Sequence, residues 1–148
     1  MLGKKVPDFS IPATGESTFR LADHKGHPIV LYFYPKDNTR VCTKEACGFR
    51  DHAAEIAAAG GAVVGVSMDT PEAHQRFSAG HGLGFPLVSD TDASICKAYG
   101  VARLSGWLPP KRVTFVIDRD GIVRNVITGE LSADAHVDGA LAALRALG

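Results

Sequence analysis

The chain has 148 residues, and its 16 basic and 16 acidic side chains give a formal net charge of zero. This length predicts one domain over residues 1–148, and the balanced charge argues against nucleic acid or an anionic membrane as the main partner. No apolar run approaches the roughly 20 residues that span a bilayer, and residues 1–7 lack the apolar core of a signal peptide. We therefore expect a cytoplasmic protein that does not associate with membranes.

Apolar, aromatic and β-branched runs predict strands at 9–11, 18–21, 29–34, 62–67, 85–88, 112–117 and 122–127. Helix-forming residues between them predict helices at 43–59, 70–80, 92–99 and 134–147. Strands that alternate with helices, followed by a hairpin and a last helix, indicate an α/β sandwich with a central mixed sheet flanked by helices. The right-handed crossover rule makes strands 29–34 and 62–67 parallel neighbours. Sites in such sheets form at the carboxyl ends of strands, and Tyr34-Pro35 lies at one of these ends.

Cys42 follows a predicted strand and a polar turn, and it lies where a helix begins. Unpaired backbone N–H groups and the positive end of the helix dipole favour a thiolate at such a position. Lys36 and Arg40 add positive charge close by in the sequence. We therefore interpret Cys42 as a reactive nucleophile rather than as a small core residue.

The other two cysteines are Cys47 and Cys96, and an odd total argues against a structural disulfide framework. Cys47 can be either a core residue or a functional partner of Cys42. Residues five apart in an intact helix have Cα atoms roughly 8–9 Å apart, whereas a disulfide needs about 7 Å or less, so a bond between the two requires the helix to open. Gly48 lowers the cost of that opening. Cys96 has apolar neighbours in a short predicted helix, and we expect it to be packed and unreactive.

No metal site is predicted. His52 follows Cys47 by five residues, but residues 42, 47 and 52 point in different directions around a helix, and Cys-x4-Cys is not the spacing of a zinc knuckle. The six histidines are scattered, and we expect them at the surface or at helix caps rather than as ligands. The Gly-rich segment 80–84 does not match a phosphate-binding loop and is interpreted as a turn. We expect no metal, flavin or haem cofactor.

The spacing of Pro35, Thr39 and Cys42 resembles the active-site signature of the peroxiredoxins. Residues 32–37 (Tyr-Phe-Tyr-Pro-Lys-Asp) and 42–51 (Cys-Thr-Lys-Glu-Ala-Cys-Gly-Phe-Arg-Asp) are similar to the peroxiredoxin Q branch, or bacterioferritin comigratory protein, an atypical two-cysteine type. The likeness extends over nearly the whole chain. Arg40-Val41 stands where this branch usually has Pro-Gly, a departure that affects the rigidity of the turn.

This resemblance implies a thioredoxin-like fold and a thiol peroxidase that reduces hydrogen peroxide and organic hydroperoxides. It implies that Cys42 is the peroxidatic cysteine, which becomes a sulfenic acid, and that Cys47 is the resolving cysteine, which forms an intramolecular disulfide with it. Thr39 and Pro35 match pocket residues, and Arg112 matches an arginine brought in from a later strand, although its position alone would suggest an ordinary strand-edge residue. The expected reductant is thioredoxin or a similar dithiol, and the expected oligomeric state is a monomer.

Ionisation of the thiol supplies only part of the rate that a peroxidase needs. A thiol of ordinary pKa is a few per cent ionised at pH 7, so full ionisation gains at most about 30-fold. The larger share should come from donors that face the breaking O–O bond. We expect these donors to be the Arg112 guanidinium, the Thr39 hydroxyl and the backbone N–H groups of Val41 and Cys42.

Two other functions fit the sequence less well. A protein thiol–disulfide oxidoreductase would carry Cys-x2-Cys, whereas this chain has Cys-x4-Cys. A non-enzymatic holdase or binding module would have no need of the cysteine pair.

Overall fold

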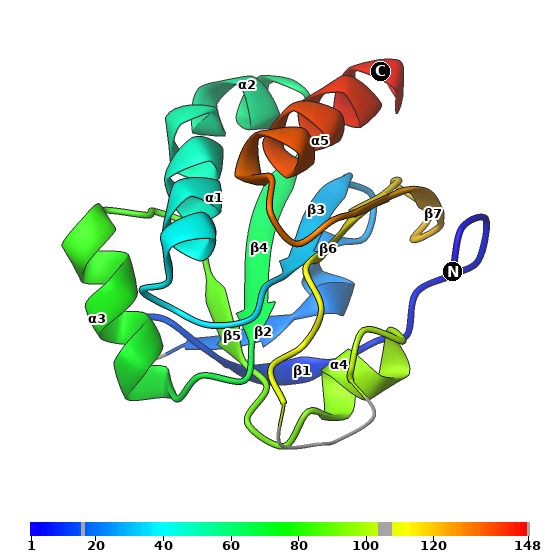
Figure 1. The fold of residues 1–148 in the computed structure, drawn as a ribbon. Coiled ribbons are helices and arrows are strands. Elements are labelled where there is room, and N and C mark those ends of the chain that lie inside the picture. The colour runs from blue at the N-terminus through cyan, green and yellow to red at the C-terminus, as the bar shows by residue number, and fades with distance from the viewer. Residues whose placement is uncertain (16, 104–107, 148) are drawn as a thin grey trace.

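The computed structural model describes residues 1–15, 17–103 and 108–147. The strands are β1 (Ser10–Ala13), β2 (Ser17–Arg20), β3 (Ile29–Phe33), β4 (Ala62–Ser67), β5 (Leu87–Ser89), β6 (Val113–Ile117) and β7 (Val123–Thr128). The helices are a short 3-10 helix η1 (Leu21–His24), α1 (Arg40–Asp51), α2 (Ala53–Ala58), α3 (Pro71–His81), α4 (Ser94–Ala98) and α5 (Ala133–Leu147) (Figure 1). In these residues, no helix has the length and apolar character needed to cross a bilayer.

The described strands form one mixed sheet in the order β2-β1-β5-β4-β3-β6-β7. β3 lies near its middle, parallel to β4 and antiparallel to β6. All residues of β3 and β6 are buried, which explains why β3 is an uninterrupted apolar run and β6 is apolar apart from Thr114. The predicted mixed sheet and the parallel pairing of β3 with β4 are confirmed.

Helices cover both faces of the sheet, and each face has its own apolar core. On one face, α1, α2, α3 and α5 contribute Phe49, Ile56, Phe77 and Leu141 to a cluster with Tyr32 and Val116 of the sheet. On the other face, α4 packs with the amino-terminal segment around Phe33 and Phe115. Figure 1 shows α1, α2 and α5 grouped together, with α4 at the other side of the sheet.

Gly48 lies where α1 packs against Val137 of α5. A Cβ at this position would lie 2.9 Å from Cγ2 of Val137, a distance that side chains do not adopt without movement. The sequence interpretation treated Gly48 as a point of helix flexibility. The structure gives it a packing role, because any larger residue would push the two helices apart.

The predicted helix over 43–59 is in fact two helices. α1 already begins at Arg40, and His52, with φ −102° and ψ 13°, separates it from α2. By contrast, α3 has the predicted start: the Thr70 hydroxyl accepts a hydrogen bond from the N–H of Ala73, and Pro71 is its first residue. Gly82, in the left-handed region at φ 57°, ends α3 within the predicted turn.

Candidate active site

Cys42 lies at the carboxyl end of β3, in the first turn of α1. Thr39 is the N-cap of the helix, and Cys42 is its third residue. Helix geometry leaves the N–H groups of Val41 and Cys42 without an acceptor inside the helix. The cysteine is only 1% exposed. The expected placement of a thiol at the positive end of a helix is confirmed.

Arg112 reaches Cys42 through the pairing of β3 with β6. Phe33 lies opposite Val113, so the residue before Val113 lies just beyond the carboxyl end of β3. Arg112 Nη2 donates to Cys42 Sγ at 3.2 Å, and its Nε donates to the carbonyl of Glu130 at 2.9 Å. These contacts fix the guanidinium against the sulfur. The structure therefore brings together two predicted site residues that are 70 positions apart.

Glu45 holds the other side of the same guanidinium. Its Oε1 accepts from Arg112 Nη1 at 2.6 Å, and both side chains are buried. Burial raises the pKa of Glu45 to about 7, although Arg112 acts in the opposite direction. Its second oxygen, Oε2, is buried and has no hydrogen-bond partner among the described residues. The guanidinium of Arg112 therefore interacts with both the sulfur of Cys42 and the carboxyl group of Glu45, whose pKa is about 7.

His136 of α5 closes the back of this cluster. Its Nε2 lies 2.8 Å from the carbonyl of Gly129, which can only accept, so we assign the ring hydrogen to Nε2. Its Nδ1 then accepts from the Thr114 hydroxyl at 2.7 Å. Burial lowers the pKa of His136, which favours this neutral form. Oε2 of Glu45 is 3.7 Å from the same Nδ1, so the acid faces a ring nitrogen whose lone pair is already used.

The remaining two predicted pocket residues lie on the loop between β3 and α1. Thr39 is exposed, and its hydroxyl donates to the carbonyl of Lys36 at 2.8 Å. The expectation that Thr39 donates to the peroxide therefore needs revision, because its hydrogen is already engaged and only its lone pairs are free to accept. Pro35 is partly buried at the start of the loop.

All three cysteines are free thiols, in different surroundings. Cys47 is partly exposed on α1, the helix that also carries Cys42. Because both belong to one intact helix, their sulfurs can meet only if this helix opens. Cys96 is fully buried in α4, and burial together with a hydrogen bond to Asp90 raises its pKa strongly. This environment agrees with the expected unreactive thiol.

A second buried polar cluster anchors the loop that precedes Cys42. His74 Nδ1 lies 2.6 Å from Asp37 Oδ2, and the Tyr34 hydroxyl donates to Asp37 Oδ1 at 2.6 Å. The prediction that all histidines lie at the surface or at caps is wrong for His74 and His136, which are both fully buried. In both cases hydrogen bonds from buried polar partners compensate for the loss of water.

The oxygen and nitrogen atoms of Asp37, Asp69 and His74 lie within 4.8 Å of one another, close enough for metal ligands. They already satisfy one another and their neighbours. Asp69 Oδ2 accepts from the Ser67 hydroxyl at 2.6 Å and from the N–H of Asp37 at 2.9 Å, and His74 Nε2 contacts the carbonyl of Val88 at 3.0 Å. We interpret this cluster as an anchor of the loop rather than as a metal site.

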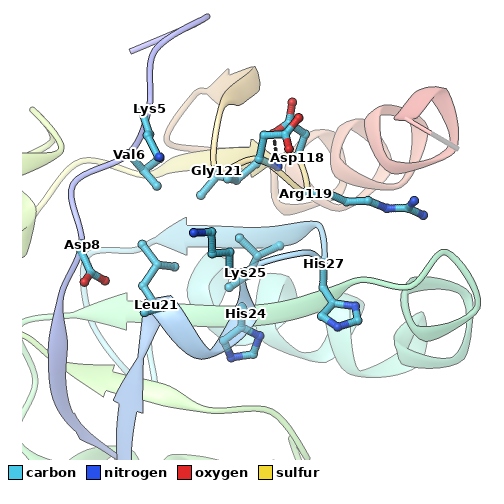
Figure 2. A pocket seen from close by; sticks show the side chains of 14 residues that line it. Lys5, Val6, Asp8, Leu21, His24, Lys25, His27, Asp118, Arg119 and Gly121 are labelled. Carbon is cyan, nitrogen blue, oxygen red and sulfur yellow. Dashed lines mark hydrogen bonds between the residues drawn. The ribbon is translucent and has the colours of Figure 1, made fainter.

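Two hollows in the surface lie at opposite ends of β3. One, of about 320 Å³, adjoins the first turn of α1 and is lined by Arg40, Val41, Lys44 and residues 131–134. The other, of about 220 Å³, lies at the amino end of β3, and Figure 2 shows His24, Lys25, His27 and Arg119 among the residues around it. The second has no cysteine in its lining. The first has none either, but it lies beside the helix turn that carries Cys42.

Residues 2–126 match the family model described as AhpC/TSA family. The chain belongs to the AhpC/TSA family of peroxiredoxins. It is 40% identical over 141 residues to a putative peroxiredoxin bcp of Coxiella burnetii, an alignment that covers 92% of this chain and 93% of that one. It is 43% identical to a putative peroxiredoxin of Mycobacterium tuberculosis, covering 98% and 96% of the two chains.

Solved peroxiredoxin structures have the same fold. Peroxidoxin BcpB from M. tuberculosis superposes with a TM-score of 0.93 at 43% identity, covering 99% of this chain and 97% of that one. The Xanthomonas campestris bacterioferritin comigratory protein gives 0.86 at 36% identity, covering 93% and 90%. The thioredoxin-like fold, the peroxiredoxin Q branch and the thiol-dependent peroxidase class predicted from the sequence are confirmed. Peroxiredoxins act on peroxides and use a dithiol reductant.

Sequence reasoning missed Glu45, Thr114 and His136, which complete the cluster behind the sulfur of this peroxiredoxin. A signal existed for Glu45, since a residue three positions after Cys42 shares its helix face. Thr114 lies two positions after Arg112 and therefore on the same side of the extended chain. His136 has no such signal, because a single histidine on an apolar helix face does not reveal what it contacts.

Proposed function

We propose that this peroxiredoxin reduces hydrogen peroxide and organic hydroperoxides with Cys42 as the attacking thiolate. The observation that carries the proposal is the 3.2 Å contact from Arg112 Nη2 to Cys42 Sγ. The thiolate attacks one peroxide oxygen, the O–O bond breaks, and Cys42 becomes a sulfenic acid. The departing oxygen takes a proton and leaves as water or an alcohol.

Arg112 and the first turn of α1 are the proposed source of transition-state stabilisation. A fixed guanidinium, held by Glu45 and by the carbonyl of Glu130, needs no reorganisation when negative charge reaches the leaving oxygen. The N–H groups of Val41 and Cys42 supply further donors, and Thr39 accepts from the peroxide O–H. Pro35 keeps water from the sulfur.

Cys47 is the proposed resolving cysteine, and its thiol attacks the sulfenic acid after α1 opens. An external dithiol, for which thioredoxin is the expected source, then reduces the disulfide. Organic hydroperoxides are included because the similar X. campestris protein is described by its alkyl peroxide reduction activity. The single domain, the monomeric state and the cytoplasmic location remain predictions, and analytical ultracentrifugation tests the monomer directly.

The test follows the cysteines by mass spectrometry. After one equivalent of peroxide, trypsin separates the three cysteines because Arg40, Lys44 and Arg50 lie between or beside them. A link between peptides 41–44 and 45–50 supports the proposal, and a link through Cys96 overturns the assignment of Cys47. Peroxide consumption should vanish in Cys42→Ser and persist in Cys96→Ser, so activity in Cys42→Ser contradicts the assigned nucleophile.

A further inference from the structure

Cys47 has its own titratable neighbour, which belongs to a different helix. Its Sγ lies 3.9 Å from Nδ1 of His81, the last residue of α3. Both residues are partly exposed, in the corner where α1 meets the carboxyl end of α3. The mechanism above gives His81 no role.

The position of His81 is fixed through its ring and its backbone. The ring packs edge-on against Phe77, with centroids 5.1 Å apart and planes at 68°. Its carbonyl accepts from Arg50 Nη1 at 2.7 Å, which ties the end of α3 to the helix that carries Cys47. Gly82 turns the chain away immediately afterwards. The imidazole is therefore held against the thiol.

The orientation of the ring suits proton transfer. Nε2 of His81 has no hydrogen-bond partner in the part of the chain that the structure describes, so it can carry the ring hydrogen towards solvent. Nδ1 then presents its lone pair to the sulfur. Charged groups at this corner include Arg50 and Asp51. The pKa of Arg50 is raised by a hydrogen bond to Asp51 and by the charge of Cys47. Arg50 also favours a negative sulfur.

We propose that His81 is the general base that deprotonates the resolving thiol of Cys47. This inference rests on the proposed function, because it concerns the second half-reaction of the same cycle. Nδ1 takes the proton from Cys47, and the thiolate, the form of cysteine that attacks, is ready when α1 opens. The new S–S bond forms as the S–O bond of the Cys42 sulfenic acid breaks. The hydroxide that leaves is protonated to water, and the imidazolium returns its proton to solvent, so the net reaction releases one water.

A single-turnover experiment separates the two half-reactions. Reduced protein is mixed with one equivalent of hydrogen peroxide and quenched at intervals, and mass spectrometry counts the dimedone-trapped sulfenic acid and the disulfide. In His81→Asn, which keeps a polar side chain but no base, sulfenic acid should form at the wild-type rate. Disulfide formation should be about 10-fold slower at pH 7, because up to about 30-fold is available from full ionisation of a thiol.

The pH profile distinguishes a base from a structural contact. The deficit of His81→Asn should shrink as the pH rises towards 9, since hydroxide then deprotonates Cys47 without help. Added imidazole should restore the rate of His81→Ala, in which the ring is removed. His52→Asn is the matched control. His52 lies at the end of α1, the helix that carries Cys47, but its ring contacts Glu55 at 2.9 Å.

Two results would overturn the role of His81. One is disulfide formation at the wild-type rate in His81→Asn. The other is a rate of disulfide formation that is lowered equally at every pH and that imidazole does not restore in His81→Ala. If the wild-type protein forms no sulfenic acid at Cys42, the proposed function fails first, and that result is visible in the same samples. Slow resolution in the variant should also increase the sulfinic form of Cys42 under excess peroxide.

Discussion

Glu45 lies 2.6 Å from the guanidinium of Arg112, and both side chains are withdrawn from water. Arg112 is therefore both the hydrogen-bond partner of the Cys42 sulfur and the counter-ion of an acid in the helix that carries this cysteine. When Glu45 is ionised, it competes with the Cys42 thiolate for the single positive charge. When Glu45 is protonated, the Cys42 thiolate is the only one of the two groups that carries a negative charge to pair with Arg112.

Glu45→Gln should change how stability depends on pH. The pKa of Glu45 is raised from 4.5 to about 7 by burial, so the folded protein binds this proton more tightly than the unfolded chain. Proton binding to Glu45 therefore contributes to the free energy of unfolding. This contribution is complete below about pH 4.5 and is lost as the pH rises through about 7, a change of about 3 kcal/mol. Denaturation by urea at several pH values should show that Glu45→Gln lacks this decline. Equal pH dependence in both proteins would mean that the pKa of Glu45 is not raised.

Arg112→Lys should lose about 100-fold in the second-order rate with hydrogen peroxide. Lysine keeps the charge but cannot contact Cys42, Glu45 and the Glu130 carbonyl with one planar group, and loss of one aligned donor costs on the order of 10²-fold. Stopped-flow kinetics with peroxide in excess measures this rate. Arg124→Lys, which changes an exposed arginine that pairs with Asp118, is the control and should stay at the wild-type value. A wild-type rate in Arg112→Lys removes the arginine from the reaction.

Gly48→Ala should lower the free energy of unfolding by up to about 2 kcal/mol. Alanine favours a helix by up to about 1 kcal/mol over glycine, but overpacking against Val137 costs about 1–3 kcal/mol. Gly80→Ala in α3 is the matched control, because its Cβ would meet nothing within 4 Å, and it should stabilise the protein. In a Val137→Ala background the effect of Gly48→Ala should change sign. Destabilisation that persists there would contradict the packing explanation.

Leu131→Asp should reduce the efficiency with organic hydroperoxides more than with hydrogen peroxide. Leu131 is 88% exposed and lines the hollow beside Val41, where the apolar part of a bulky peroxide would lie. We expect a fall of about 3- to 10-fold in kcat/KM for cumene hydroperoxide, equivalent to the loss of one partly buried apolar contact. Leu2→Asp changes an exposed leucine that does not line this hollow and should have no effect. An equal loss with both peroxides would show that the hollow does not select the substrate.

The sequence predicts the elements that follow from local signals. The strand 62–67 and the start of α3 at Pro71 agree with the structure because a β-branched run and an N-cap with proline act over a few residues. The break at His52 was not predictable, since neither glycine nor proline marks it. Cys42 was found because a helix start is a local feature.

The rest of the site depends on long-range pairing. Arg112 meets Cys42 only because β6 aligns with β3, and His136 meets Glu45 only because α5 lies against α1. The resemblance to peroxiredoxins supplied Arg112, whereas nothing in the sequence indicated His136. Residues whose roles depend on tertiary contacts stay hidden until the fold is known.

Glu45 lies within the short stretch that begins at Cys42 and ends at Cys47. The proposed disulfide requires α1 to open around Glu45, and we expect this opening to withdraw the carboxyl group from its buried place beside Arg112. In water, the pKa of Glu45 returns from about 7 to its ordinary value of 4.5, so the carboxyl group releases the proton that burial had stabilised. Oxidation of the cysteines is therefore tied to proton release, so that the reduction potential of the pair should vary with pH more steeply than two thiols alone would require.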